Sequence, residues 1–537
     1  MPPAARAEPG IEALFARFGP AYRWLVTAGG LLGAMSMVLS ATMVNVAVPS
    51  IMGAFGVGQD LAQWAATAFL ATMVASQLLS AWMVKALGEK LAFLIINAVF
   101  LVGTTIAVSS NAFEFVIVGR VLQGFSAGTI QPMVMALIFR IFPPQMRGLA
   151  MGVYGTGIQI APMLGPMLGG MVIDALSWRE IFLVPVPFCL VSVVLGITFL
   201  PGGLTARDLP KFDWLSFILL CAAIVFLLTA GANGQRLGWT SNSLLLLAGT
   251  ALVTGSIFVW RQLRIPSPLL DFSLFRNATF ASAVTVSFVF GIGNFASNYI
   301  VPVFVQEVQG FTPGLAGFLL LPAGILVIST TSFFGRLADR FPAHIMVMVG
   351  ISMFACGNFL MSSADVNTTF WTFALYIVVA RFGMAMIMPS LSASALRALT
   401  PEQVSKGSGT VNFCRQFGGA FGITSLVIFT EQRIQFHGEA LTATQTPGNL
   451  ASKQLLDYVG NLMGQAGLPQ ALHNSGALNY LGKVIEAQAM TMGYQDGFIM
   501  ISIVFALALI PAWILGRASP AAKPRKKRGF SRRLRTS

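Results

Sequence analysis

Residues 39–51, LSATMVNVAVPSI, belong to an apolar run that is long enough to cross a membrane as a helix. The stretch carries no charged residue, and its polar side chains include Ser40, Thr42 and Asn45. A membrane-spanning helix needs about 20 predominantly apolar residues, and this run covers residues 24–48. The pattern predicts a membrane helix whose polar face can donate and accept hydrogen bonds but holds no charge.

The composition of the whole chain agrees with this reading. The chain has 537 residues, of which 55% are hydrophobic and 10% are charged, and its mean hydropathy is +0.76. Soluble domains carry about 25% charged residues. We therefore expect an all-α integral membrane protein, because the apolar runs are too long and too unbroken for barrel strands of about 10 alternating residues.

Fourteen apolar runs are long enough to span a bilayer. They divide the chain into a lead (1–23), a six-helix bundle (24–200), two inserted helices with their linkers (201–278), a second six-helix bundle (279–516) and a basic tail (517–537). The expected spans are 24–48, 61–84, 91–109, 115–138, 148–170, 181–200, 213–232, 243–262, 279–304, 313–334, 345–364, 370–391, 407–430 and 496–516. The second bundle includes an external segment, 431–495, with an apolar stripe from Ala477 to Ile485 that predicts an amphipathic helix.

The charge distribution predicts the orientation of the chain. The sequence has 33 Lys and Arg against 19 Asp and Glu, a formal net charge of +14. The basic residues gather in the connectors on one side of the expected spans, which places both termini in the cytoplasm. The tail is better explained as a topology anchor against anionic lipid than as a nucleic-acid-binding segment.

The sequence offers no pattern for a metal site, a disulfide or an enzyme. Cys189, Cys221, Cys356 and Cys414 are far apart and lie in expected spans, and the three histidines show no ligand spacing. The phosphate-binding, metalloprotease and serine-hydrolase motifs are missing from the sequence. We expect no enzymatic activity and no cofactor other than a proton gradient.

Three arginines lie well inside expected spans, where a charged side chain is costly and marks a functional pathway by default. They are Arg120, Arg381 and Arg415. Arg120 lies in RVLQGFSAG, with Gln123 one turn later on the same face, and we interpret it as a charge beside a coupling or substrate site. Arg381 is better explained as a structural residue. Arg415 fits either role.

Two motifs predict moving parts. GVYGTGIQIAPMLGPMLGG, residues 152–170, gives a bent helix with flat faces that lets two bundles approach closely and rock. Its hinge residues are Gly152, Gly165, Pro166, Gly169 and Gly170. GRLADRF at 335–341 predicts a cytoplasmic gate or, alternatively, a plain topology anchor; the gate residues are Gly335, Asp339 and Arg340.

Taken in order, these motifs resemble those of the major facilitator superfamily, in its fourteen-helix drug/proton antiporter branch of EmrB/QacA type. The matching stretches are VNVAVP (44–49), RVLQG (120–124), GPMLGG (165–170), WREIF (178–182), FDW (212–214), PLLD (268–271), GRLADRF (335–341) and NFCRQFGGAFG (412–422). The external stretch QAMTMGYQDGF (488–498) is similar to the form found in tripartite pumps of Gram-negative bacteria.

The resemblance implies two bundles around a central cavity and proton-coupled efflux of amphipathic compounds by alternating access. It further implies a bacterial inner-membrane location, with a periplasmic adaptor (a membrane fusion protein) and an outer-membrane channel as partners. The residues that we expect to line the substrate cavity are Ser40, Thr42, Asn45, Gln159, Asn294 and Asn298.

The chain departs from the family pattern in its first helix, where Ser40 occupies the position of an expected aspartate. Without that acid, the helix neither pairs with a cation nor takes up a proton. We therefore expect a preference for neutral or anionic amphipaths, with Arg120 favouring an anion. The proton would travel on the substrate or on Glu114 or Glu307, and we expect Gln123 and Arg415 to take part in coupling. Two alternatives remain: a passive facilitator or an exporter of one neutral or anionic metabolite without this coupling, and a sensor without transport.

Overall fold

The computed structural model describes residues 9–57, 59–62, 64–201, 212–238, 240–266, 268–338, 341–446 and 448–518. None of these residues lies in a β-strand, so the prediction of an all-α chain is confirmed. The α-helices are α1 (Pro9–Phe18), α2 (Tyr22–Phe55), α3 (Gln59–Ala62), α4 (Trp64–Ser76), α5 (Ser80–Val108), α6 (Phe113–Ile141), α7 (Arg147–Ala175), α8 (Val186–Phe199), α9 (Trp214–Leu237), α10 (Asn242–Gln262), α11 (Ala278–Glu307), α12 (Pro313–Ala338), α13 (Ala343–Met361), α14 (Phe370–Arg397), α15 (Val404–Ala443), α16 (Leu450–Gln465), α17 (His473–Leu507) and α18 (Leu509–Ala518).

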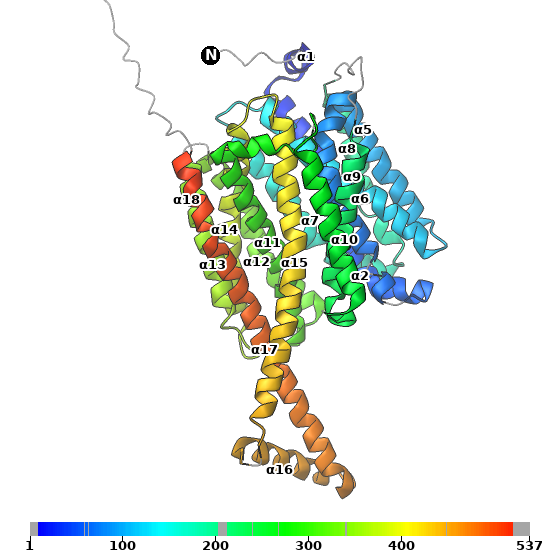
Figure 1. Ribbon diagram of the computed structural model, residues 1–537, viewed down its shortest axis with the longest axis vertical. Helices are drawn as coiled ribbons and strands as arrows, with labels where there is room; N and C mark the ends of the chain where they lie inside the picture. The colour runs from blue at the N-terminus through cyan, green and yellow to red at the C-terminus, as the bar shows by residue number, and fades with distance from the viewer. Residues whose placement is uncertain are drawn as a thin grey trace, which may run out of the picture.

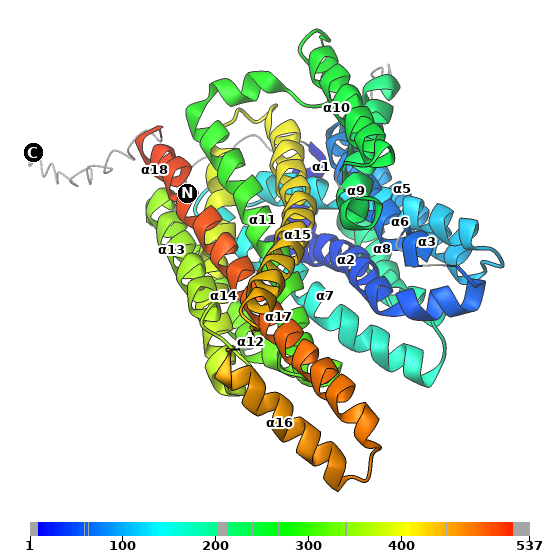
Figure 2. The same cartoon turned by 60° about the horizontal axis from the view of Figure 1, so that its bottom comes forward.

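Two groups of helices stand side by side in the bundle (Figure 1). The first contains α2 and α4 to α8, in blue to cyan, and the second contains α11 to α15 with α17 and α18, in green to red. The inserted pair, α9 and α10, lies at the edge of the bundle, where α9 packs against α4 and α15 and α10 packs against α9 (Figure 2). Below, we call the first group the N-terminal half and the second group the C-terminal half.

Within the described residues, eleven helical segments are long and apolar enough to cross a membrane. One of these runs from Trp64 to Val108 through α4, a 3-10 turn (Gln77–Leu79) and α5. Gly88 interrupts it with φ 76° and ψ 165°, a conformation that glycine adopts readily and L residues rarely adopt. The long, glycine-rich α7 and the more polar α15 are not among the eleven, although both run along the bundle in Figure 1. The count of fourteen spans therefore stays a prediction.

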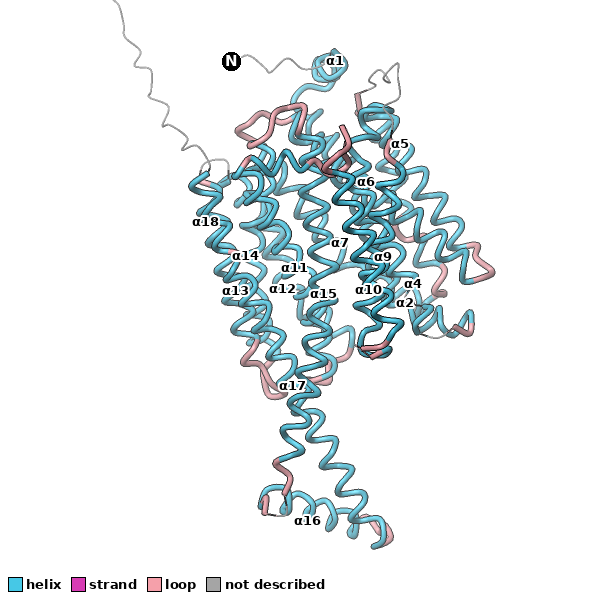
Figure 3. The backbone as a smooth tube through the Cα atoms, viewed as in Figure 1, coloured by secondary structure: helices cyan, strands magenta, loops and turns pink. Residues whose placement is uncertain are grey.

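Side-chain caps fix where the inserted pair and the second half begin. Asp213, Ser241 and Asn277 precede α9, α10 and α11, and each side-chain oxygen accepts a hydrogen bond from a backbone N–H two or three residues later. Such caps satisfy N–H groups that the first turn of a helix leaves without partners. The polar connectors are therefore kept at the ends of the bundle, where Figure 3 shows the loops.

The segment expected outside the membrane, 431–495, forms a helical hairpin in its described residues. Helix α15 continues through residue 430 to Ala443, α16 lies across the tip, and α17 runs back without a break from His473 into the last span. The hairpin projects from the end of the bundle opposite α1 (Figures 1 and 3). The predicted amphipathic stripe is thus part of α17, where Ala477 is buried but Leu478 and Val484 are exposed.

Candidate transport site

Arg120 lies where four helices of the N-terminal half meet. From α6, its Nε donates to the carbonyl oxygen of Ala65 in α4 at 2.7 Å. Its Nη1 donates to Gln123 Oε1 at 3.0 Å and to Ser40 Oγ in α2 at 3.2 Å. Gln123 Nε2 in turn donates to Thr104 Oγ1 in α5 at 2.8 Å. The arginine therefore joins the predicted first-helix serine and the predicted coupling glutamine in one network.

This network encloses a charge that has no counter-ion among the residues that the structure describes. The side chain of Arg120 is fully buried, its guanidinium lies 4.1 Å from the centre of the Phe69 ring, and its Nη2 has no hydrogen-bond partner. None of its partners in the described part of the chain is a carboxylate. Ser40, at the position of the expected acid, faces the guanidinium directly, so the chain replaces an ion pair by neutral hydrogen bonds.

Arg381 occupies the corresponding place in the C-terminal half. It lies in α14, the fourth helix of that half, and contacts α11, the first. Its Nη2 donates to Asn298 Oδ1 at 2.7 Å and its Nη1 to Asn294 Oδ1 at 3.3 Å. Both amides are predicted cavity residues, and the structure brings them together with an arginine that the sequence favoured as structural.

Arg415 connects the two halves. From α15 it donates through Nη2 to Asn412 Oδ1 and to Gln131 Oε1 in α6. Gln416 Nε2 donates to the same Gln131 oxygen at 3.3 Å, and Ser408 Oγ donates to the Pro132 carbonyl oxygen at 3.0 Å. The sequence did not single out Gln131, although an amide in an apolar run is itself a signal.

The glycines of the predicted hinge and gate form the second contact between the halves. A Cβ added to Gly152 in α7 would lie 2.9 Å from the Thr331 carbonyl oxygen in α12. One added to Gly335 in α12 would lie 2.6 Å from the Gly148 carbonyl oxygen in α7. Only glycine allows these two backbones to approach so closely. Both contacts lie at the end where α7 begins and α12 ends.

Two of the remaining hinge glycines, Gly165 and Gly169, pack within the N-terminal half. A Cβ on Gly165 would lie 2.0 Å from Thr42 Oγ1, and one on Gly169 would lie 3.4 Å from the Met43 carbonyl oxygen, whereas Gly170 has open space around it. Thr42 Oγ1 donates to the carbonyl oxygen of Leu39 at 3.1 Å. Thr42 therefore faces the hinge helix. The side chains of Asn45, Gln159 and Pro166, and the gate residues Asp339 and Arg340, lie outside the described residues.

The two candidate proton carriers lie near the ends of helices. Glu114 is exposed in the first turn of α6. Glu307, the last residue of α11, accepts a hydrogen bond from the Tyr494 hydroxyl of α17 at 2.9 Å through Oε2. The hydrogen bond of Glu307 does not join this acid to the Arg120 network, and the exposed Glu114 is not among the partners of that network. Their role in coupling remains a prediction.

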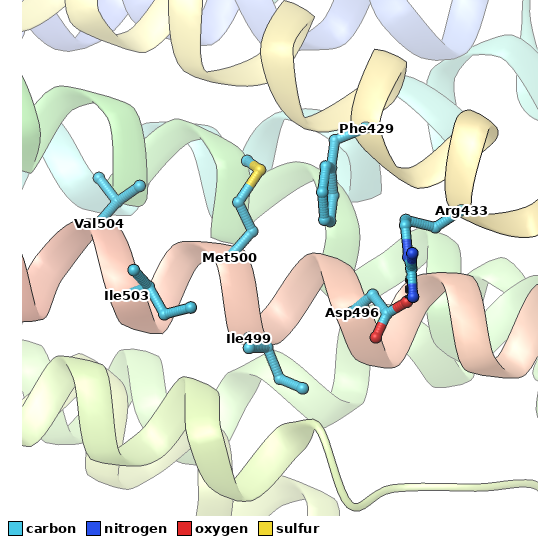
Figure 4. A pocket seen from close by; sticks show the side chains of 7 residues that line it. All are labelled: Phe429, Arg433, Asp496, Ile499, Met500, Ile503 and Val504. Carbon is cyan, nitrogen blue, oxygen red and sulfur yellow. Dashed lines mark hydrogen bonds and ion pairs between the residues drawn. The ribbon is translucent and has the colours of Figure 1, made fainter.

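A further cluster, which sequence reasoning missed, joins α15 to α17 where the external hairpin begins. Arg433 pairs with Asp496, and His437 Nε2 lies 2.7 Å from Asp496 Oδ2. Figure 4 shows Arg433 and Asp496 pointing toward each other at one end of an apolar groove of about 290 Å³. The groove is lined by Phe429, Arg433, Asp496, Ile499, Met500, Ile503 and Val504. These charges are distant in sequence, so only the packing of the helices reveals the cluster.

The fold and these sites define a multi-pass membrane protein of the transporter class: two helical halves with buried cations and glycine-mediated contacts between them. The chain belongs to the Major Facilitator Superfamily, whose sequence profile matches residues 30–423. The relatives described next include drug-efflux proteins of that family.

Two relatives come from Escherichia coli (strain K12), and each is 26% identical to this chain. The multidrug export protein EmrB aligns over 90% of this chain and 93% of its own length. The probable multidrug resistance protein EmrY aligns over 91% of this chain and 94% of its own length. The uncharacterised transporter YhcA of Bacillus subtilis (strain 168) is also 26% identical, over 93% of both chains.

Solved structures support the same fold. The human organic anion transporter MFSD10 matches with a TM-score of 0.58 and 14% identity, over 92% of this chain and 99% of its own. The proton:xylose symporter XylE matches with a TM-score of 0.57 and 12% identity, over 93% of this chain and 97% of its own. The major facilitator fold is thus confirmed.

Proposed function

We propose that the protein exports amphipathic small molecules across the bacterial inner membrane in exchange for protons, by alternating access. The family and the named relatives support drug efflux. The single structural observation that carries the mechanism is the glycine contact between the halves. It joins α7 to α12 near one end of the bundle, and the hydrogen bonds from α15 to α6 lie between that end and the middle of the bundle.

That end is the one where α6 ends, α7 begins and α15 begins, and we assign it to the cytoplasm because the basic connectors gather there. Toward the other end, Asn298 and Tyr299 of α11 are exposed. A closed cytoplasmic gate with polar residues exposed on the far side is the arrangement expected of a carrier that is ready to release substrate outward. Rocking at the α7–α12 contact would open the gate.

We further propose that the external hairpin of α15, α16 and α17 contacts a periplasmic adaptor, which would link the exporter to an outer-membrane channel. The support is the geometry of the hairpin, which projects beyond the bundle, and the exposed apolar side chains on it. Leu450, Tyr458, Leu462 and Leu472 are all exposed, and exposed apolar patches of this kind mark interaction sites.

The test is transport by the purified full-length protein in proteoliposomes. Vesicles are given a pH gradient and a panel of cationic, neutral and anionic amphipaths, and each assay is repeated with a protonophore. We expect the gradient to drive accumulation and the protonophore to abolish it. Downhill flux that ignores the gradient would contradict antiport.

The amide and hydroxyl partners of Arg120 and Arg381 favour a second candidate, a passive facilitator. Neither arginine has a carboxylate partner among the described residues, and a proton-coupled carrier usually needs a membrane acid that can titrate. The same proteoliposome assay separates the two candidates, because a facilitator equilibrates its substrate and cannot concentrate it.

A further inference from the structure

Arg381 is nearly buried, yet one of its two asparagine partners is exposed. Its Nη1 contacts both Met384 Sδ at 3.4 Å and Asn294 Oδ1, and its Nη2 donates to Asn298 Oδ1. The arginine is 8% exposed, whereas Asn298 is exposed and Asn294 is partly exposed. A ligand that displaced or joined the two amides would therefore meet the cation.

The charge of Arg381 is uncompensated within the described residues. Its hydrogen-bond partners are two carboxamides and a thioether, all of them neutral. Burial of a cation without a counter-charge is costly, and hydrogen bonds to neutral groups offset that cost only in part. An anion placed beside the guanidinium would gain charge-assisted hydrogen bonds, which are about twice as strong as neutral ones.

The two asparagines are suited to receive the same anion. They lie four residues apart on α11 and so share one face of that helix. Asn298 Nδ2 already points back to Asn294 Oδ1 at 3.4 Å. Each carboxamide carries two N–H donors as well as an oxygen acceptor. A half-turn of the Asn298 carboxamide about its Cβ–Cγ bond exchanges the positions of Oδ1 and Nδ2. The N–H donors of Asn298 then face the ligand.

Arg120 does not offer such a site in this conformation. It is fully enclosed, and its hydrogen-bond partners come from two neighbouring helices, α2 and α4, and from its own helix. Arg120 and Arg381 therefore differ in role, although they occupy equivalent helices of the two halves: Arg381 can meet a ligand, and Arg120 cannot.

We propose that Arg381, Asn294 and Asn298 form a binding site for the carboxylate of an amphipathic organic anion. The inference rests on the proposed function and names the substrate class of that exporter. The carboxylate binds the guanidinium fork through two parallel hydrogen bonds, and the asparagine amides donate to its outer lone pairs.

The test measures equilibrium binding to the full-length protein in detergent, without any gradient, so it is independent of proton coupling. The probes are two xanthene dyes of similar size: fluorescein, an organic anion, and rhodamine 123, a cation. Fluorescence anisotropy gives both affinities. We expect wild type to bind fluorescein more tightly than rhodamine 123.

The decisive variant is Asn298→Asp, which gives Arg381 a counter-ion and leaves the fold intact because it adds a favourable charge pair. We expect it to weaken fluorescein binding at least about tenfold without weakening rhodamine 123 binding. Arg381→Lys keeps the charge but loses the planar fork, and we expect a smaller loss. The matched control is Asn367→Asp, which adds the same charge to an exposed loop residue between α13 and α14.

A selective loss of fluorescein affinity in Asn298→Asp, with Asn367→Asp unchanged, supports the site. The proposal is overturned if wild type shows no preference for fluorescein, if Asn298→Asp binds it as wild type does, or if both aspartate variants lose it equally. Failure of gradient-driven transport in proteoliposomes would overturn the antiport proposal alone, because binding is measured without a gradient.

Discussion

Arg120 and Arg381 sit on equivalent helices of the two halves, yet their surroundings differ. Arg120 is sealed among α2, α4, α5 and α6 and holds a carbonyl oxygen, a hydroxyl and an amide together. Arg381 contacts two asparagines of a single neighbouring helix, and one of these is exposed. The difference indicates that Arg120 holds helices of the N-terminal half together, whereas Arg381 of the C-terminal half is placed to contact a ligand.

Removing each charge in turn should separate the roles of the two arginines. We expect Arg120→Met to lower the melting temperature strongly and to abolish transport, because it leaves buried polar groups without partners, at about 1–3 kcal/mol each. We expect Arg381→Met to lower the melting temperature less, because Asn298 is exposed and its side chain can form hydrogen bonds with solvent instead. Thermal unfolding in detergent measures both, and equal destabilisation would contradict the distinction.

The second prediction restores the acid that the first helix lacks. Ser40 Oγ lies 3.2 Å from Arg120 Nη1, so Ser40→Asp places a carboxylate against the buried cation. We expect a higher melting temperature, because a hydrogen bond to a charged group contributes about 1.5–3 kcal/mol. We also expect gained efflux of cationic dyes. Ser40→Asn is the neutral control, and a Ser40→Asp variant that gains no cationic-dye efflux would count against this account of selectivity.

The third prediction concerns the hinge within the N-terminal half. Gly165→Ala would place a methyl group 2.0 Å from Thr42 Oγ1, whereas Gly170→Ala would enter open space. We expect the first variant to reduce the transport rate by about tenfold or more through strain between α2 and α7, and the second to stay near wild type. Equal rates in the two variants would show that close packing of α7 on α2 is not needed for rocking.

The smallest effect is expected at the linker that precedes the C-terminal half. Asp271 pairs with Lys406 at the start of α15, with Oδ2 and Nζ 3.3 Å apart. Burial raises the pKa of Asp271, but the hydrogen bond from Ser273 and the charge of Lys406 outweigh it and hold that pKa below its usual value. The pair therefore stabilises the fold above about pH 4 and loses its effect as the carboxylate takes up a proton.

We expect Asp271→Asn to cost at most about 1 kcal/mol at neutral pH, since both partners are partly exposed and solvent screens the pair. The difference in melting temperature from wild type should shrink as the pH falls below 4. A constant difference across that range would assign the effect to packing instead of charge.

Much of the fold follows from the sequence, because apolar length and basic connectors are local signals. Gly152 and Gly335 were also predictable as contact points, because a helix face that carries glycine allows another helix to pack closely against it. The same holds for the three membrane arginines as residues of interest. Their cost in an apolar environment is high wherever they point.

The pairing of these residues was not predictable from the sequence. Arg381 was predicted to be a structural residue, and its two asparagine partners come from a helix more than 80 residues earlier in the chain. Gln131 and the Asp496–His437 contact were missed for the same reason. Helix packing decides which faces meet, and hydropathy carries little information about rotation around a helix axis.

The most direct measurement follows protons while the substrate moves. Proteoliposomes holding a trapped pH indicator receive an amphipathic substrate, and the internal pH is recorded for wild type and for Ser40→Ala. The account predicts a substrate-driven proton flux in both, because Ser40 carries no titrating group and coupling must reside elsewhere. Substrate movement without any proton flux in wild type would contradict antiport and establish a passive facilitator.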